Sequence, residues 1–390
     1  MANYVSGVNP SILKWAREKA GYSIDEVARS LKRDSQDILL WEAGLATPTY
    51  SQLEKLAYSV YKRPIAVFFF PRPPEEQDPG QAFRTLPDSE IDNLLPDTRL
   101  AIREALAMQI ALRELTDGRN PGERLIFREL HVEPSHNAVF VARRVREYLK
   151  IDIDEQFRWS GFTEALKNWR SIIQDNGIFV FKRSFKQVDI SGFSLVDDDF
   201  PVIYLNNSTT KTRQIFSLFH ELAHILLSTS GVTKADDQYI NVLTGRARNI
   251  EVFCNQFAAE YLVPSDDFDK RVSLDKPTEQ LVDNLATLYK VSREVILRKL
   301  LDRHMISQEY YESKTSEWHR EWREKREGRK TGGNYYATQA AYLGERFLNI
   351  TFAKYYEGSL SLQQLADYLS VKAQNVAGIE QFVLKGASAE

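Results

Sequence analysis

The sequence predicts a multidomain protein with an all-α head, an α+β body and a helical C-terminal tail. At 390 residues, the chain exceeds the usual size of a single domain. Helix-start and helix-stop signals follow one another closely up to residue 70, where a Pro-rich stretch interrupts them. From about residue 160, short apolar runs typical of strands lie between helical patterns, as expected of an α+β domain.

The head, residues 1–70, is predicted to contain five short helices. The residues that begin these helices are capping side chains or a proline, and Ser23 with Glu26 forms a capping box. The third helix is expected to run to about Glu42, with Gly44 after its end. The expected starts are, in order, Asn9-Pro10, Ser23, Ser35, Thr49 and Pro64.

Shifts in composition divide the remainder of the chain. A Pro-rich run at 71–80 indicates an exposed linker, and Gly332-Gly333 indicates a hinge before the tail. The predicted segments are a linker at 71–96, a helical connector at 97–160, the α+β body at 161–265, a helical extension at 266–330 and a small helical C-terminal domain at 331–390.

The body combines both kinds of periodicity. Its helices are expected at 163–175, 214–227 and 249–262, the last one stopping before Pro264. Its strands are expected at 178–181, 193–196 and 202–205, and a polar loop is expected after the second helix. In the extension, 276–304 is predicted helical, and the charged stretch 314–330 is either a solvated helix or a linker.

Composition restricts the functional classes. The formal net charge of −3 means that any contact with nucleic acid must come from a local patch. The single cysteine, Cys254, excludes an intrachain disulfide framework and suits a reducing compartment. No apolar run approaches the roughly 20 residues of a membrane span. We therefore expect a cytoplasmic protein with no membrane partner.

The second body helix contains the motif His-Glu-x-x-His, formed by His220, Glu221 and His224. Two histidines four residues apart lie on one face of a helix and can bind the same Zn²⁺. Glu221 would lie on the adjacent side, where its carboxylate can accept a proton from the attacking water as the catalytic base of a peptidase. Because the flanking residues are apolar, the motif is expected to be buried; the alternative is a core helix whose histidines are satisfied by hydrogen bonds.

A catalytic zinc site needs a third protein ligand, and the next helix offers Glu251. Asn255 lies one turn after Glu251, on the same face, and can support a ligand imidazole through a hydrogen bond. Cys254 is the alternative ligand, although its apolar neighbours favour a small core residue. Glu260 is expected at the surface or in support of a ligand.

Two segments carry a resemblance to a known family. Residues 213–224 read RQIFSLFHELAH, and residues 251–264 read EVFCNQFAAEYLVP. With the helical head, they make the chain similar to ImmA/IrrE metallopeptidases of the long form, which carry an N-terminal Xre-type helix-turn-helix; Ala223 stands where that family usually has Gly. The resemblance implies a zincin-like body in which His220, His224 and Glu251 bind zinc. Members of this family cleave repressor proteins or act as regulators.

The head resembles an Xre-type DNA-binding domain. Such domains place the start of the third helix in the major groove of double-stranded DNA. Ser35 and Gln36 would then face bases, and Lys32 and Arg33 would lie near phosphates. The balance of ten basic and eight acidic residues between 1 and 75 is unfavourable for strong binding, so a protein-docking or dimerisation head is the alternative.

The expected function is therefore a regulatory zinc metalloendopeptidase that cleaves a protein target, such as a repressor, and that itself binds DNA as a homodimer. The alternative is a non-proteolytic Xre-type regulator or antitoxin-like module with a structural or sensing zinc site. If the chain is a peptidase, the strand at 193–196 is expected to pair with an extended substrate.

Overall fold

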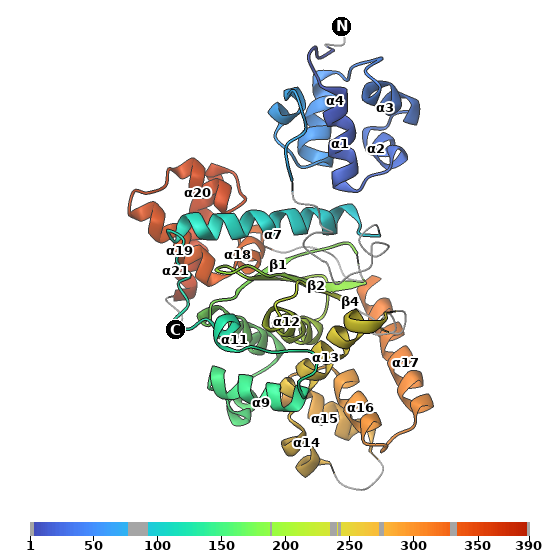
Figure 1. Cartoon of the computed structure of the whole chain (residues 1–390), viewed down its shortest axis with the longest axis vertical. Coiled ribbons are helices and arrows are strands. Elements are labelled where there is room, and N and C mark those ends of the chain that lie inside the picture. Colours follow the sequence, from blue (N-terminus) through green and yellow to red (C-terminus); the bar gives the residue numbers. More distant parts are fainter. Residues whose placement is uncertain are drawn as a thin grey trace. The chain divides into compact units, whose positions relative to one another are not determined.

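A computed structural model (Figure 1) describes residues 4–76, 93–187, 189–234, 240, 243–272, 277–327 and 334–387. The chain forms two compact units. Unit 1 comprises Met1–Leu106 with Phe185–Gln187, and unit 2 comprises Ala107–Ser184 with Val188–Glu390. The boundary falls inside a long helix, α7 (Pro96–Leu115). This division into two units is coarser than the six segments predicted from the sequence. The boundaries of those segments therefore remain predictions.

Unit 1 begins with short helices at each of the five predicted starts. They are α1 (Pro10–Ala20), α2 (Ile24–Leu31), α3 (Ser35–Glu42), α4 (Tyr50–Glu54) with its π-helical continuation η1 (Lys55–Val60), and the 3₁₀-helix η2 (Ile65–Phe69). Their apolar faces meet in a core that includes Ile12, Val27, Ile38, Leu53 and Phe68. The capping box of Ser23 and Glu26 is formed as the sequence predicted.

The predicted cap of α3 was wrong by one residue. The carboxylate of Asp34 accepts a hydrogen bond from the backbone N–H of Gln36 at 2.8 Å, which makes Asp34 the N-cap. Ser35 is instead the first helical residue, and its hydroxyl donates to Asp25 at 2.5 Å. An aspartate competes well with a serine for this position because its charge also complements the helix dipole.

Helices connect the head to the sheet of unit 2. The predicted linker is described only up to Glu76, whose carboxylate pairs with Arg63 at 2.8 Å, and residues 77–92 lie outside the described residues. The helices that follow are α7, α8 (Ile126–Glu129), α9 (Ala138–Leu149), α10 (Ile153–Arg158) and α11 (Phe162–Asp175). Helix is thus observed within the predicted helical connector at 97–160 and close to the helix predicted at 163–175.

Unit 2 contains a four-stranded mixed sheet with the order β1-β3-β2-β4. The strands are β1 (Phe179–Arg183), β2 (Ile190–Leu195), β3 (Val202–Asn206) and β4 (Val232–Lys234). β1 and β3 are parallel, and β2 is antiparallel to both β3 and β4. Because β2 is paired on both sides, the prediction that the strand at 193–196 pairs with substrate is wrong. β4 was also missed, since a polar loop was expected there.

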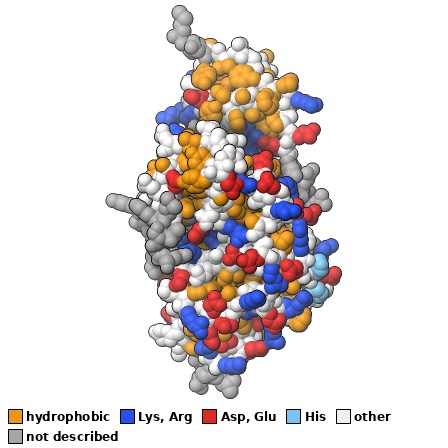
Figure 2. All heavy atoms as spheres, turned by 90° about the vertical axis from the view of Figure 1, so that its left-hand side faces the viewer, with side chains coloured by type: hydrophobic (Ala, Val, Ile, Leu, Met, Phe, Trp, Pro, Cys, Tyr) orange, Lys and Arg blue, Asp and Glu red, His pale blue; other side chains and the backbone are white. Residues whose placement is uncertain are grey.

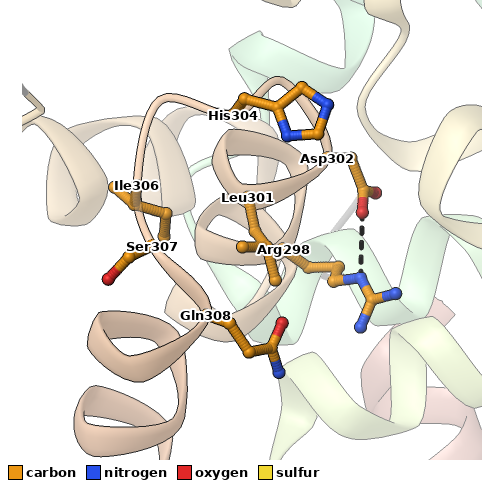
Figure 3. Close-up of a pocket in the computed structure, with 7 residues that line it drawn as sticks. All are labelled: Arg298, Leu301, Asp302, His304, Ile306, Ser307 and Gln308. Carbon is orange, nitrogen blue, oxygen red and sulfur yellow. Dashed lines mark hydrogen bonds and ion pairs between the residues drawn. The ribbon is translucent and has the colours of Figure 1, made fainter.

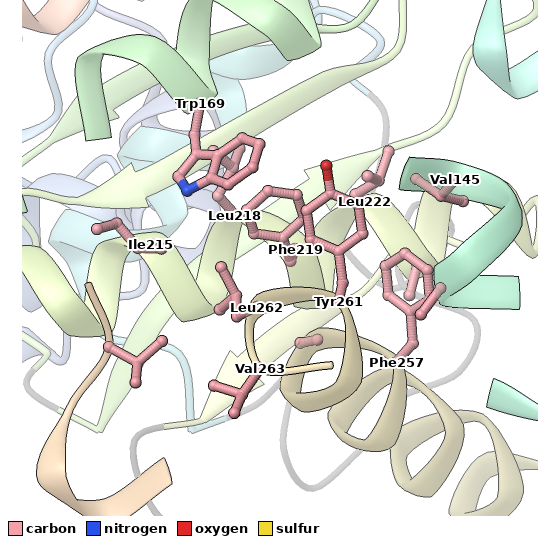
Figure 4. Packing of buried hydrophobic residues seen from close by; sticks show 14 of the residues in the cluster. Val145, Trp169, Ile215, Leu218, Phe219, Leu222, Phe257, Tyr261, Leu262 and Val263 are labelled. Carbon is pink, nitrogen blue, oxygen red and sulfur yellow. The ribbon is translucent and has the colours of Figure 1, made fainter. Parts of the chain in front are cut away.

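Two long helices position the site: one lies against this sheet, and the other packs on the first (Figure 1). They are α12 (Lys211–Leu226) and α13 (Gly245–Leu262), which agree with the helices predicted at 214–227 and 249–262. Aromatic side chains join them: the ring of Phe219 stacks on that of Tyr261 at 4.2 Å between centroids, and Trp169 of α11 meets both rings edge-on. Figure 4 shows these rings packed with leucine and valine side chains between the helices.

The remaining helices complete unit 2. They are α14 (Ser265–Arg271), α15 (Glu279–Tyr289), α16 (Arg293–Asp302), α17 (Gln308–Glu327), α18 (Tyr335–Leu343), α19 (Glu345–Tyr356), α20 (Leu362–Tyr368), η4 (Ala373–Asn375) and α21 (Val376–Ala387). The charged stretch is therefore helix up to Glu327, and the tail is helical as predicted. The predicted hinge at Gly332-Gly333 lies outside the described residues. Within the described part of the chain, no helix combines the length and the apolar character needed to cross a bilayer.

Candidate metal centre

Helix α12 brings His220 and His224 together in the interior of unit 2. Both side chains are buried, with 1% and 0% of their surface exposed. Their Nε2 atoms lie 3.2 Å apart. The one-turn spacing of the motif therefore aims two imidazole nitrogens at the same point, as a shared ligand requires.

Helix α13 adds a carboxylate to this pair. Glu251 Oε2 lies 3.3 Å from His220 Nε2, and Glu251 Oε1 lies 3.3 Å from His224 Nε2. The carboxylate is also buried, with 2% of the residue exposed. Burial by itself would raise the pKa of Glu251, but the neighbouring imidazoles of His224 and His220 lower it well below its usual range.

The outer nitrogens of the two imidazoles have their own partners. His220 Nδ1 lies 2.8 Å from the side-chain oxygen of Asn255, on α13. His224 Nδ1 lies 3.3 Å from Thr229 Oγ1, and that hydroxyl donates to the backbone carbonyl of His224. With both Nδ1–H groups donating outward, both Nε2 atoms present lone pairs to Glu251.

This arrangement needs a cation. Two Nε2 lone pairs and two carboxylate oxygens are all acceptors, and they converge in a buried place where their mutual repulsion is not screened by water. In the absence of a metal, a proton on His224 relieves this repulsion: burial lowers the pKa of His224, but Cys254 and Glu251 together raise it well above its usual value.

The distances fit a divalent metal of the size of zinc. A tetrahedral ion with bonds of about 2.0–2.1 Å separates its ligand atoms by about 3.3–3.4 Å. The separations between His220, His224 and Glu251 are 3.2, 3.3 and 3.3 Å. The residues present therefore match a three-ligand centre in both donor type and spacing.

Cys254 is a fourth donor in the same place. It is fully buried on α13, and its sulfur together with one nitrogen of His220 and one of His224 forms a group within 4.8 Å. Burial raises the pKa of this thiol to about 11, although His224 acts in the opposite direction. The geometry alone therefore leaves two ligand sets, one completed by Glu251 and one by Cys254.

The carboxylate of Glu221 lies on the sheet side of α12. Its Oε2 accepts a hydrogen bond of 2.5 Å from the hydroxyl of Ser194 on β2, and its Oε1 accepts one from the hydroxyl of Thr233 on β4. The residue is fully buried. Both oxygens are thus held by hydroxyl groups of neighbouring strands.

Comparison with known families locates this centre within a recognised domain. Residues 173–301 match the IrrE N-terminal-like domain of the peptidase M78 family. The matched range runs from the end of α11 to α16 and contains His220, Glu221, His224 and Glu251. The M78 match supports the resemblance to ImmA/IrrE proteins and a metallopeptidase-type function; it includes neither the head nor the tail. No curated protein matches the chain.

One glycine of the matched segment controls the space around His224. A Cβ atom added to Gly231 would lie 2.3–2.5 Å from three atoms of the His224 ring, closer than real contacts allow. Gly231 also accepts a backbone hydrogen bond from Ser194 at 2.9 Å. Sequence reasoning missed both Gly231 and Thr233, because their roles depend on the pairing of β4 with β2.

The predicted DNA-contact residues lie in unit 1, at the junction of α2 and α3. Lys32, Arg33 and Gln36 are exposed. Lys32 ends α2 in a left-handed conformation, and Arg33 lies 3.7 Å from Asp37. The hydroxyl of Ser35 is engaged with Asp25, so it is less available to a base than the sequence suggested.

Two further features of unit 2 lie outside the centre. Glu260 was expected at the surface or in support of a ligand, and the surface alternative was wrong: its buried carboxylate pairs with Lys299 at 2.5 Å and accepts a hydrogen bond from the backbone N–H of Ser265 at 2.7 Å. An open hollow of about 560 Å³ lies at the turn between α16 and α17. Figure 3 shows the Arg298–Asp302 pair beside His304 in its lining, which includes none of the residues described above.

Proposed function

We propose that this protein is a zinc-dependent metalloendopeptidase with a regulatory role, which cleaves a protein target such as a transcriptional repressor. The observation that carries the proposal is the convergence of His220, His224 and Glu251 around one point, with Glu221 on the adjacent side of the same helix. The M78 match supports the peptidase class, and the repressor target rests on the resemblance to ImmA/IrrE proteins.

His220, His224 and Glu251 would hold the zinc ion. Glu251 is favoured over Cys254 because its two oxygens contact both imidazoles separately, whereas Cys254 lies among apolar core side chains such as Phe253 and Phe257. Asn255 and Thr229 would fix the orientation of the imidazoles from behind. Zinc bound there would polarise the scissile carbonyl and bring the pKa of a bound water to about 7.

Glu221 would act as the general base. Its carboxylate would accept the proton of the attacking water and then pass that proton to the leaving amine. Ser194 and Thr233 would hold the carboxylate from the sheet side, so that its position is fixed before the substrate binds. The ligands and the base come from one helix and its neighbour, which the aromatic core holds rigid.

The Glu221→Gln variant tests this function. It keeps the size of the side chain but removes the base, so cleavage of the target should fall by about 10²–10⁴-fold, while zinc content and folding stay unchanged. The inactive protein should also retain its uncut target during purification from cells. A regulatory effect that is intact in Glu221→Gln would overturn the peptidase assignment.

A second function is proposed for the head, namely binding of double-stranded DNA by a homodimer. The favouring observation is that Lys32, Arg33 and Gln36 are exposed together where α3 begins. Under this proposal Gln36 would read a base, and Lys32 and Arg33 would contact phosphates, with Ser35 in a smaller role. If the M78 centre lacked peptidase activity, zinc would be structural or sensory and this head would carry the function.

A further inference from the structure

Strand β1 places a lysine in the interior of unit 2. Lys182 is the penultimate residue of β1, and only 8% of its surface is exposed. Among the described residues, no hydrogen bond or ion pair is formed by its ammonium group. Burying such a group without a counter-charge is strongly unfavourable. The position therefore favours a neutral lysine or a bound anion over an ammonium without a counter-charge.

A second cation lies beside this strand. Arg170 of α11 donates to the backbone carbonyl of Val180 at 2.6 Å and to that of Ala341, on α18, at 2.9 Å. Its Nε is buried without a hydrogen-bond partner in the described structure. Because side chains alternate along a strand, Lys182 shares a face with Val180, which packs in the core formed with α11 and α12.

The N-terminus of α12 supplies a third positive group. β1 and β3 are parallel, with Lys182 opposite Leu205, and β3 leads through a short turn into α12. The carboxyl ends of both strands and the start of α12 therefore lie at the same edge of the sheet, where anions bind in many folds. Lys211 is the first residue of this helix and is partly exposed, which leaves the edge accessible to solvent.

These charges act on one another. Burial, with smaller contributions from the positive charges of Arg170 and Lys211, lowers the pKa of Lys182 to about 6. Burial and Arg170 also lower the pKa of Lys211. Within the described residues, no acidic group contributes to the shift of either lysine. Among the described residues the chain thus supplies no counter-charge to these lysines, and a bound anion would favour the charged form of Lys182.

We propose that Lys182, Arg170 and Lys211, together with the N-terminus of α12, bind a doubly charged tetrahedral oxyanion such as phosphate. Arg170 offers its Nε–H, which has no partner among the described residues, the lysines present point charges, and the helix start adds oriented N–H groups. A bound oxyanion would link β1 and α11 to the first turn of the helix that carries His220. This proposal is independent of the peptidase function.

Thermal unfolding of the zinc-loaded full chain tests the site. Ten millimolar inorganic phosphate, compared with chloride at equal ionic strength, should raise the unfolding midpoint of the wild type by about 2–5 °C. Lys182→Met has a similar shape without the charge, and it should lose at least half of that rise. Lys270→Met is the matched control, since Lys270 is an exposed lysine on α14, and it should keep the full rise.

A second variant, at a more exposed position, keeps the test decisive if Lys182→Met does not fold. Lys211→Gln changes only a partly exposed residue and should weaken the affinity for phosphate about tenfold, as measured by calorimetry. Absence of any phosphate effect on the wild type would overturn the proposal. An undiminished effect in Lys182→Met and Lys211→Gln would also overturn it, because phosphate would then be bound elsewhere, for example at the zinc centre.

Discussion

His220, His224 and Glu251 offer only acceptor atoms to one another, because Asn255 and Thr229 take the outer imidazole N–H groups. This pattern explains why the motif is buried: a low-dielectric interior strengthens the attraction of these acceptors for a cation. The residue-by-residue hydrogen bonding, more than the motif itself, supports the proposed metal centre over a core helix with satisfied histidines.

The same reasoning assigns a positioning role to Thr233, which rests on the proposed function of Glu221. Thr233→Val keeps the shape but removes the hydroxyl that donates to Glu221. The carboxylate should lose its fixed orientation, so kcat should fall about 10-fold or more with KM and zinc content nearly unchanged. Thr233→Ser should restore most of the activity. Equal losses in the valine and serine variants, measured on the cleaved target, would contradict this role.

Elements differ in how well the sequence predicted them. Helices with caps at both ends, such as α1 and α2, were predicted within a residue or two, because their signals are local. β4 has only three residues, and its pairing with β2 is visible only in three dimensions. For the same reason the sequence identified β2 as a strand but not as an interior one, and it gave no role to Thr233 or Gly231.

A substitution at Gly231, which directly precedes β4, tests whether this strand positions the His224 ring. In Gly231→Ala, the new methyl group would displace the His224 ring, so zinc affinity should fall about 10–100-fold, a loss typical of a misoriented ligand. Gly161→Ala is the matched control, because a Cβ there meets nothing within 4 Å and the backbone is extended. Competition with a chelator measures both affinities. Unchanged zinc affinity in Gly231→Ala would show that β4 does not control the ligand.

At the scale of the whole molecule, the chain joins a small helical unit to a larger one that contains the segment similar to the M78 family. Unit 1 exposes several large apolar side chains, and Figure 2 shows hydrophobic side chains gathered at the top of the face drawn. The large apolar side chains that unit 1 exposes are Tyr4, Leu39, Leu45, Tyr50, Tyr58, Phe69, Phe70 and Leu95. Such a surface suits contact with another protein as well as with DNA, so the head needs its own test.

For the head, we expect weak and salt-sensitive DNA binding by the full-length chain, because residues 1–75 carry a balance of only two positive charges. Gln36→Ala should lose sequence preference, whereas Lys32→Ala and Arg33→Ala should weaken binding to all sequences alike. Fluorescence anisotropy with promoter fragments at low salt measures both effects. If these three variants bound DNA like the wild type, the head would instead be a protein-docking or dimerisation unit.

The composition of the metal centre is tested most directly by the zinc content of purified variants. The wild type should contain about one zinc ion per chain, as one three-ligand site implies. Glu251→Ala should lose most of it, and Cys254→Ala should keep it, because only Glu251 contacts both imidazoles through separate oxygens. Full zinc content in Glu251→Ala together with its loss in Cys254→Ala would contradict the proposed ligand set, and a wild type without zinc would contradict the metallopeptidase itself.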